Sequence, residues 1–342
     1  MKTWLGIRAL IVTCVAVVVA SCGDTSTEPV VTGGRKPVTA PSRLEATSIN
    51  EGTVGLRWTS SDTSVTAFVV RCSAVSGADS ARSVRITDRT ATTASVAGLK
   101  EGVIYSFTVS AIRDSIANGS VVLSDTSAAS SAVQWAPARR GSGVYRLYSS
   151  QSADTALGQG LAIFRASGVP AVLSTANGGE WDICFDDTDP TNPRFGAPGQ
   201  SGYVDAASLF PNGQKARMVM INDNIYINVN SLDDIYESTA LSVLETDNDK
   251  MFPLNIHSLP LSSNGIAFVV ATMDVVSKQY NFAKVLLKKQ SNGGFVAGSG
   301  ASAYIEVEIS YQTMRSVPHA LRMKFDEAVI RSSDGQSRSA DR

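Results

Sequence analysis

Short runs of alternating apolar and polar residues recur at regular intervals between residues 41 and 136, and this spacing limits the fold more than any other feature of the sequence. The runs occupy residues 54–58, 67–74, 83–87, 92–96, 104–111 and 121–124, with turn-forming residues between them. Evenly spaced short strands are typical of an antiparallel β-sandwich. In the second run, Phe68, Val70 and Cys72 fall on one face of the strand. We therefore expect this face, and Trp58, to be buried.

The segment around Tyr105 carries the most specific pattern in the chain. Residues 97–111 read AGLKEGVIYSFTVSA, with the pair Gly98-Leu99 ahead of the tyrosine. This arrangement resembles the fibronectin type III domain, in which a Gly-Leu turn precedes a tyrosine that opens the sixth strand. The resemblance covers residues 41–136. It implies an immunoglobulin-like sandwich with a tyrosine corner, in which the Tyr105 hydroxyl bonds the backbone a few residues upstream.

The resemblance constrains activity only weakly, because fibronectin type III domains serve as spacers or as binding scaffolds. Residues 113–119 are expected to form a loop, where adhesive members of the family carry an integrin-binding tripeptide. The sequence at this place is Arg113-Asp114-Ser115, so that activity does not carry over. We therefore expect the domain to be a spacer.

The N-terminal residues 1–21 resemble the signal peptide of a bacterial lipoprotein. Lys2 and Arg8 accompany an apolar run at residues 10–19, which is too short to span a bilayer. The run leads into Val-Ala-Ser-Cys22, which looks like a lipobox. The resemblance implies acyl chains on Cys22, a lipid bilayer as partner, and an extracytoplasmic location at the outer membrane or cell surface. The alternative is a plain signal peptide with Cys22 incidental.

Composition and missing motifs bear on the tether, on nucleic acid binding, on catalysis and on the cysteines. Residues 22–40 are rich in Thr, Pro and Gly and are expected to form a flexible tether. The chain has 30 Lys and Arg against 31 Asp and Glu, so we expect no nucleic acid partner. With two histidines and no nucleophile elbow, phosphate loop, HExxH or CxxC motif, it is not expected to be an enzyme. Cys72 and Cys184 are expected to be buried thiols, or a disulfide if the domains pack closely.

Residues 143–331 are predicted to form a second β-rich domain after a joint at residues 135–143, so the fold class is all-β. Strand patterns occupy residues 144–148, 161–164, 181–185, 218–221, 225–229, 266–272, 282–287 and 304–311. Apolar and polar residues alternate along the last of these strands. This predicts one buried face and one face, with Glu306, Glu308 and Ser310, in water. A helix is expected at residues 318–330, followed by a disordered tail at residues 332–342.

Parts of the second domain resemble the HmuY family of lipid-anchored haem-binding proteins. The resemblance rests on residues 179–185, GEWDICF, and on the late strands from residue 266 onward. Members that bind haem hold the iron between two axial side chains, usually His. The resemblance places His257 near the second ligand, but no histidine occupies the place of the first. A methionine is the remaining option there, and the candidates are Met218, Met220 and Met251. The alternative for His257, as for His319, is an ordinary loop histidine.

Several carboxylates invite comparison with known sites. Asp186, Asp187 and Asp189 are spaced like calcium ligands on a loop, although the same residue types form plain turns. A glycosidase carboxylate pair could be drawn from Glu180, Asp182 and Asp186. Strand alternation instead places Asp182 and Asp186 opposite the apolar face, where we expect them to be solvated.

Three functional hypotheses follow from these patterns. The first is a lipid-anchored surface protein whose C-terminal domain binds a ligand, with haem and calcium as candidate cofactors. The second is an adhesion or glycan-binding module with the fibronectin domain as spacer. The third is an uncharacterised extracytoplasmic enzyme, which would need perturbed carboxylates gathered in a cleft.

Overall fold

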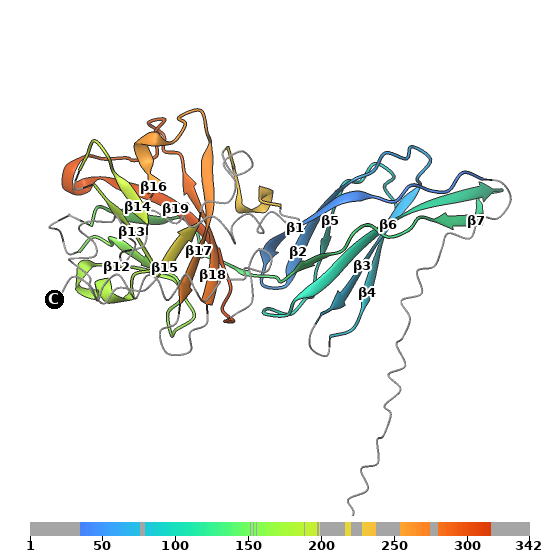
Figure 1. Ribbon diagram of the computed structural model, residues 1–342, viewed down its shortest axis with the longest axis horizontal. Coiled ribbons are helices and arrows are strands. Elements are labelled where there is room, and N and C mark those ends of the chain that lie inside the picture. Colours follow the sequence, from blue (N-terminus) through green and yellow to red (C-terminus); the bar gives the residue numbers. More distant parts are fainter. Residues whose placement is uncertain are drawn as a thin grey trace, which may run out of the picture.

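The computed structural model describes residues 35–75, 79–150, 152, 154, 156–187, 189–196, 198, 216–219, 228–236, 254–273 and 280–315. Within them the regular secondary structure is mostly β-strand, and the helices are short 3-10 turns (Figure 1). The predicted signal peptide, Cys22, the predicted helix at residues 318–330 and the predicted tail lie outside the described residues. None of the described helices has the length and apolarity that crossing a bilayer requires.

The first part of the chain forms a sandwich of two antiparallel sheets. One sheet has the strand order β1-β2-β5, and the facing sheet has the order β4-β3-β6-β7 with β8 also paired to β6. Their bounds are β1 Ser42–Asn50, β2 Thr53–Thr59, β3 Ala67–Ala74, β4 Arg82–Ile86, β5 Thr93–Val96, β6 Tyr105–Ala117, β7 Ser120–Thr126 and β8 Val133–Trp135. Every strand predicted for this part is confirmed, whereas β1 and β8 lie where none was predicted.

The core of this sandwich is aromatic. Trp58 and Phe68 are buried, and their ring centroids lie 5.4 Å apart. On β3, Phe68, Val70 and Cys72 are buried while Arg71 is exposed, as the alternation predicts. Burial raises the pKa of the Cys72 thiol to about 11, so the side chain stays protonated and packs as a small apolar group.

The structure contains the tyrosine corner that the sequence predicts. Tyr105 is fully buried, and its hydroxyl accepts a hydrogen bond from the Lys100 backbone N–H at 2.9 Å. The same hydroxyl donates to an Asp79 carboxylate oxygen at 2.5 Å. Burial, and then the bond to Asp79, raises the pKa of Tyr105 to about 12. The hydroxyl therefore keeps its proton and holds the connection into β6 in place.

The predicted loop at residues 113–119 is instead part of a long hairpin. β6 continues to Ala117, and Asn118 and Gly119 make the turn into β7 with φ angles of 51° and 76°. Asn-Gly favours such a two-residue hairpin turn because both residues tolerate positive φ. In Figure 1 this hairpin projects at the end of the molecule opposite the second pair of sheets.

The second part of the chain consists of two further sheets that pack face to face. One has the order β10-β19-β18-β17-β15 with β9 paired to β19, and the other has the order β12-β11-β13-β14-β16. The first sheet comprises β9 Arg139–Arg140, β10 Tyr145–Tyr148, β15 Ala216–Val219, β17 Gly265–Met273, β18 Tyr280–Lys288 and β19 Tyr304–Tyr311. The second comprises β11 Gly160–Ala162, β12 Ala171–Leu173, β13 Ile183–Asp186, β14 Arg194–Gly196 and β16 Leu254–Asn255.

Side chains from both of these sheets meet in one core. Phe195 on β14 packs edge-on against Phe268 on β17, with ring centroids 5.3 Å apart. The 3-10 turns of this part are η1 Thr175–Glu180, η2 Leu232–Asp234, η5 Ile256–Ser258 and η6 Gly300–Ser302. Trp181 follows η1, so β13 starts later than predicted, at Ile183. Val229 lies in no strand, and residues 225–227 lie outside the described residues.

The two sandwiches share a buried apolar boundary. Ala267 and Val269 on β17 and Leu286 on β18 point away from Phe268, and they belong to the same cluster as the core of the first sandwich. Leu232 of η2 and Ile235 lie in that cluster as well. The predicted wet face of β19 is therefore partly wrong, because Ser310 pairs with β9 and is 1% exposed.

Candidate functional site

The boundary between the sandwiches contains a buried lysine. Lys284 on β18 is 1% exposed, and its Nζ donates to the Ile235 carbonyl oxygen at 3.3 Å. The same Nζ lies 4.8 Å from the centroid of the Trp135 ring, a cation-π contact. The Trp135 indole N–H donates to Ser48 Oγ at 2.7 Å, and that hydroxyl donates to the Ala136 carbonyl oxygen at 2.8 Å. These contacts join β18 of the second sandwich to β8 and β1 of the first.

Further polar contacts cross the same boundary. Arg140 on β9 donates through Nε to the Ile49 carbonyl oxygen of β1 at 3.0 Å. Glu101, in the turn before β6, accepts from Arg139 Nε at 2.9 Å and from Thr313 Oγ1 at 2.6 Å. Desolvation by burial lowers the pKa of Arg140, although nothing near physiological pH would deprotonate a guanidinium. The residues of the predicted joint are therefore packed between the two sandwiches.

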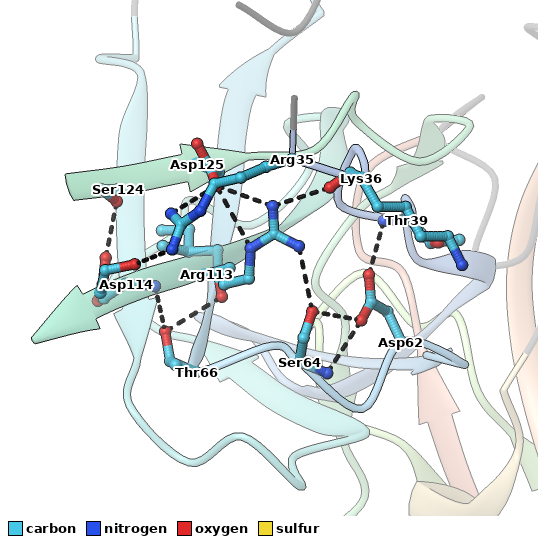
Figure 2. Close-up of polar contacts among 12 residues, drawn as sticks. Arg35, Lys36, Thr39, Asp62, Ser64, Thr66, Arg113, Asp114, Ser124 and Asp125 are labelled. Atoms are coloured by element: carbon cyan, nitrogen blue, oxygen red, sulfur yellow. Dashed lines mark hydrogen bonds and ion pairs between the residues drawn. The ribbon is translucent and has the colours of Figure 1, made fainter. Parts of the chain in front are cut away.

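The first described residues of the chain are bound to the base of the β6–β7 hairpin (Figure 2). Arg35 donates through Nη2 to Ser115 Oγ at 2.8 Å, and its Nη1 lies 3.4 Å from an Asp125 oxygen. Arg113 on β6 pairs with the same carboxylate at 2.8 Å and donates to the Lys36 carbonyl oxygen at 2.8 Å. The predicted tether at residues 22–40 is thus wrong over its last residues, which pack against the domain.

The loop that contains Asp62 and Ser64 binds the N-terminal segment at Thr39. Asp62 accepts from the Thr39 N–H at 3.0 Å and from the Ser64 hydroxyl at 2.6 Å (Figure 2). The Ser64 hydroxyl, then the Thr39 N–H, lowers the pKa of Asp62 to about 2. A pocket of about 410 Å³ lies beside it, lined by residues 60–63, 65 and 89–92. Since Asp62 is already engaged, the polar groups of the lining are serine and threonine hydroxyls and the Arg89 side chain.

His257 lies on η5 and is exposed. Its ring Nδ1 is 3.1 Å from the Thr191 carbonyl oxygen, and its backbone N–H donates to Asn255 Oδ1 at 3.0 Å. An axial haem ligand needs a ring nitrogen directed into a buried porphyrin slot. An exposed ring on a loop carbonyl does not fit that role. Met220, Met251, His319 and the Met218 side chain lie outside the described residues.

Each of the three aspartates considered as calcium ligands has a different environment in the structure. Asp186 on β13 is buried, and Asp187 accepts from the Ser149 hydroxyl. Asp189 accepts from the Thr191 N–H at 2.9 Å, which is an Asx turn. Across the part of the chain that the structure describes, no group of three His, Cys, Asp or Glu side chains could hold a metal ion.

The prediction that Asp182 and Asp186 are solvated is wrong, because all four residues of β13 are buried. Asp182, just before β13, is 2% exposed. Its carboxylate accepts from the Ile163 and Phe164 N–H groups at 2.6 and 3.1 Å and from Thr272 Oγ1 at 2.8 Å. Burial raises the pKa of Asp182 to about 6. These bonds cross-link the two sheets, so the role of Asp182 is structural.

The remaining sequence candidates are also explained by packing. Glu180 is exposed and pairs with Arg165 at 3.3 Å, so it does not complete a catalytic pair with Asp182. Cys72 and Cys184 are buried in different sandwiches and are not joined by a disulfide. Glu180 and Asp182 are thus both explained by structural contacts.

The tip of the β6–β7 hairpin is apolar and exposed, which the sequence analysis did not predict. Ile116, Val121 and Val122 are 67%, 58% and 64% exposed, and Leu123 is 37% exposed. Ile116 pairs with Val121, next to the Ala117–Ser120 pair that flanks the turn, and a register shift lies between Ser115 and Ile116. β7 is the edge strand of its sheet. The pair Asn118-Gly119, with Ile116 two residues before it and Val121 two residues after it, is the sequence signal that could have identified this hairpin.

A family comparison identifies the first sandwich. The fibronectin type III domain family matches residues 39–120. Similar solved structures include a myokine structure, with 19% identity over 30% of this chain and 99% of that chain and a TM-score of 0.25. The fn3 domain of human collagen alpha-1(XX) chain shows 20% identity over 33% of this chain and 96% of its own, with a TM-score of 0.25. The FN5 domain of Drosophila Lar shows 14% identity over 30% and 97%, with a TM-score of 0.22.

No curated protein matches the chain. The family match covers the strands that carry the buried Trp58 and the tyrosine corner of Tyr105. Residues 39–120 are therefore a fibronectin type III domain, and further β-sheets follow it in the chain.

Proposed function

We propose that this chain is a lipid-anchored, extracytoplasmic protein in which the fibronectin type III domain is a rigid spacer. The spacer carries the C-terminal sandwich, as a ligand-binding unit, away from the membrane. The observation that supports the proposal best is the packed boundary around Lys284 and Trp135. A boundary with apolar packing and directional bonds restrains the second sandwich, whereas a flexible linker would let it swing.

The fibronectin domain receives the N-terminal segment at one end and contacts the second sandwich at the other, which supports the same proposal. The chain enters the fibronectin domain at Arg35, beside the β6–β7 hairpin. The second sandwich lies at the opposite end of that domain (Figure 1). An anchor at Cys22 would therefore place the fibronectin domain between the bilayer and the second sandwich. Asp62 and Asp182 are engaged in structural hydrogen bonds, which favours a non-catalytic role.

The anchor is tested by changing the residue that would carry the lipid. We expect the native chain to incorporate labelled palmitate and to partition into detergent, and Cys22→Ser to do neither. Cys14→Ser is the matched control, since that cysteine lies within the predicted signal peptide. A native chain that is recovered in the aqueous phase with an unmodified N-terminus would refute the proposal.

Display outside the cell is tested separately. Val169 in the second sandwich is 58% exposed, so Val169→Cys supplies a reactive thiol far from the anchor. We expect a membrane-impermeant maleimide to label this variant on intact cells. Failure to label intact cells, with normal labelling after lysis, would show that the second sandwich does not face the exterior.

The haem hypothesis has its own test. Because His257 is exposed and its ring lies against the Thr191 carbonyl, we expect no intense Soret band when haem is added to residues 23–342. A band that forms at micromolar haem and weakens in His257→Ala would instead make haem the ligand.

A further inference from the structure

The exposed apolar tip of the β6–β7 hairpin needs an explanation that the spacer role does not supply. Val121, Val122 and Leu123 are consecutive exposed residues of β7, and the exposed Ile116 pairs with Val121. The hairpin that carries them extends past the sandwich (Figure 1). Single exposed apolar residues are ordinary on protein surfaces, but a contiguous patch of β-branched and aliphatic residues marks a contact surface. An unprotected edge strand with such residues is also prone to pairing with other chains.

The position of this patch indicates which surface it meets. Arg35, the first described residue, is bonded to Ser115 and Asp125 at the base of the same hairpin. Only 12 residues lie between Cys22 and Arg35 in the sequence, so 13 Cα-to-Cα steps connect them. A segment of that length spans at most about 45 Å even when fully extended. An anchor at Cys22 therefore keeps Arg35, and with it the base of the hairpin, within about 45 Å of the bilayer.

The distribution of charge along the hairpin suits a membrane surface. The apolar residues are at the tip, whereas the charged residues lie at the base and are paired. Asp125 pairs with Arg35 and Arg113, and Asp114 pairs with Arg85 at 2.5 Å. Insertion of the tip would thus bury apolar surface and leave the paired charges at the level of the lipid headgroups.

We propose that the tip of the β6–β7 hairpin inserts into the bilayer that holds the lipid anchor, and so fixes how the protein stands on the membrane. This inference rests on the proposed lipid anchor at Cys22. A single anchor on a chain segment sets distance but not orientation, and a second contact point sets both. The partner is the acyl and headgroup boundary of a bilayer, reached by apolar contact rather than by net charge.

The inference is tested with the mature, lipidated chain in phosphatidylcholine vesicles. An environment-sensitive dye is attached at Val121→Cys, with Val169→Cys as the matched control because both valines are 58% exposed. Cys72 and Cys184 are buried and should not react. We expect the dye at position 121 to shift to the blue and to be quenched by brominated lipid, and the dye at position 169 to do neither.

Two further measurements separate the outcomes. Adding Val122→Asp to the labelled Val121→Cys chain should abolish the blue shift while the protein still floats with the vesicles. Flotation without a shift at position 121 in the parent chain would overturn the hairpin insertion and leave the anchor intact. Loss of flotation would overturn the anchor itself. A blue shift that is present without vesicles and disappears on dilution would assign the patch to a second copy of the chain, against the inference.

Discussion

At the scale of single residues, the carboxylate of Asp182 determines part of the pH dependence of stability. Burial raises its pKa to about 6 in the folded chain, above the 3.8 of an exposed aspartate. A raised carboxyl pKa means that the folded state binds the proton more tightly than the unfolded state. The contribution is therefore fully present below about pH 4 and is lost as the pH rises to about 6, by about 3 kcal/mol.

Asp182→Asn isolates this contribution. The amide oxygen can accept from the Ile163 and Phe164 N–H groups, and the amide nitrogen can donate to Thr272. We expect urea unfolding of the native chain to show a loss of stability between pH 4 and pH 6 that Asp182→Asn lacks. Parallel pH profiles for the two chains would show that another group is responsible.

Tyr105 gives a second test at this scale. Tyr105→Phe removes the hydroxyl that accepts from Lys100 and donates to Asp79, while the buried ring remains. Because one of the two bonds is to a charged group, we expect a cost of about 2 kcal/mol in the free energy of unfolding. A double-mutant cycle with Asp79→Asn should show coupling between the two sites. Additive effects would mean that the corner is held by the ring alone.

At the scale of elements, the close approach of β11 to Trp181 sets a steric limit. A Cβ added at Gly160 would lie 2.0 Å from the Trp181 ring, which is 0% exposed. We expect Gly160→Ala to lower the free energy of unfolding by about 3 kcal/mol, because the core has no space for the methyl group. Gly294→Ala is the control, since its nearest neighbour would be at 3.5 Å. Equal effects of the two substitutions in thermal unfolding would contradict this account.

The elements also show what sequence patterns can and cannot predict. Strands with one buried face, such as β3, follow from alternation and match their predicted bounds. β17 is buried on both faces, with Phe268 in the core and Val269 in the boundary, and its near-continuous apolar run is typical of that environment. β13 is also buried on both faces, but its apolar run ends in Asp186, so alternation misplaced the carboxylates.

The candidate sites were harder to predict, for a physical reason. His257 and the aspartates near Asp186 are residue types that can bind haem iron or calcium. A binding site, however, requires several such side chains to lie close together, and this depends on pairings between strands that are distant in the sequence. The hairpin tip was predictable from Asn118-Gly119 alone, because a two-residue turn is a local feature. The burial of Lys284 in the boundary was not predictable, because no local sequence signal marks this lysine as buried.

At the scale of the whole molecule, the shared boundary couples the two sandwiches. Apolar side chains of β17, β18 and η2 belong to one cluster with the fibronectin core, and Arg140 and Glu101 add bonds across it. Separate domains unfold in separate steps, whereas domains with a large common core unfold together. We therefore expect the native mature chain to show one calorimetric transition.

Breaking the polar contacts should separate that transition into two. Arg140→Ala with Glu101→Ala removes the bonds to Ile49, Arg139 and Thr313 and lowers the coupling by about 2 kcal/mol for each charged contact. Arg146→Ala is the matched control, because it breaks an exposed pair with Glu306 inside the second sandwich and should cost about 0.5 kcal/mol without splitting the transition. Two resolved transitions already present in the native chain would show that the sandwiches are thermodynamically independent, and a spacer built from them could not hold the second sandwich in one orientation.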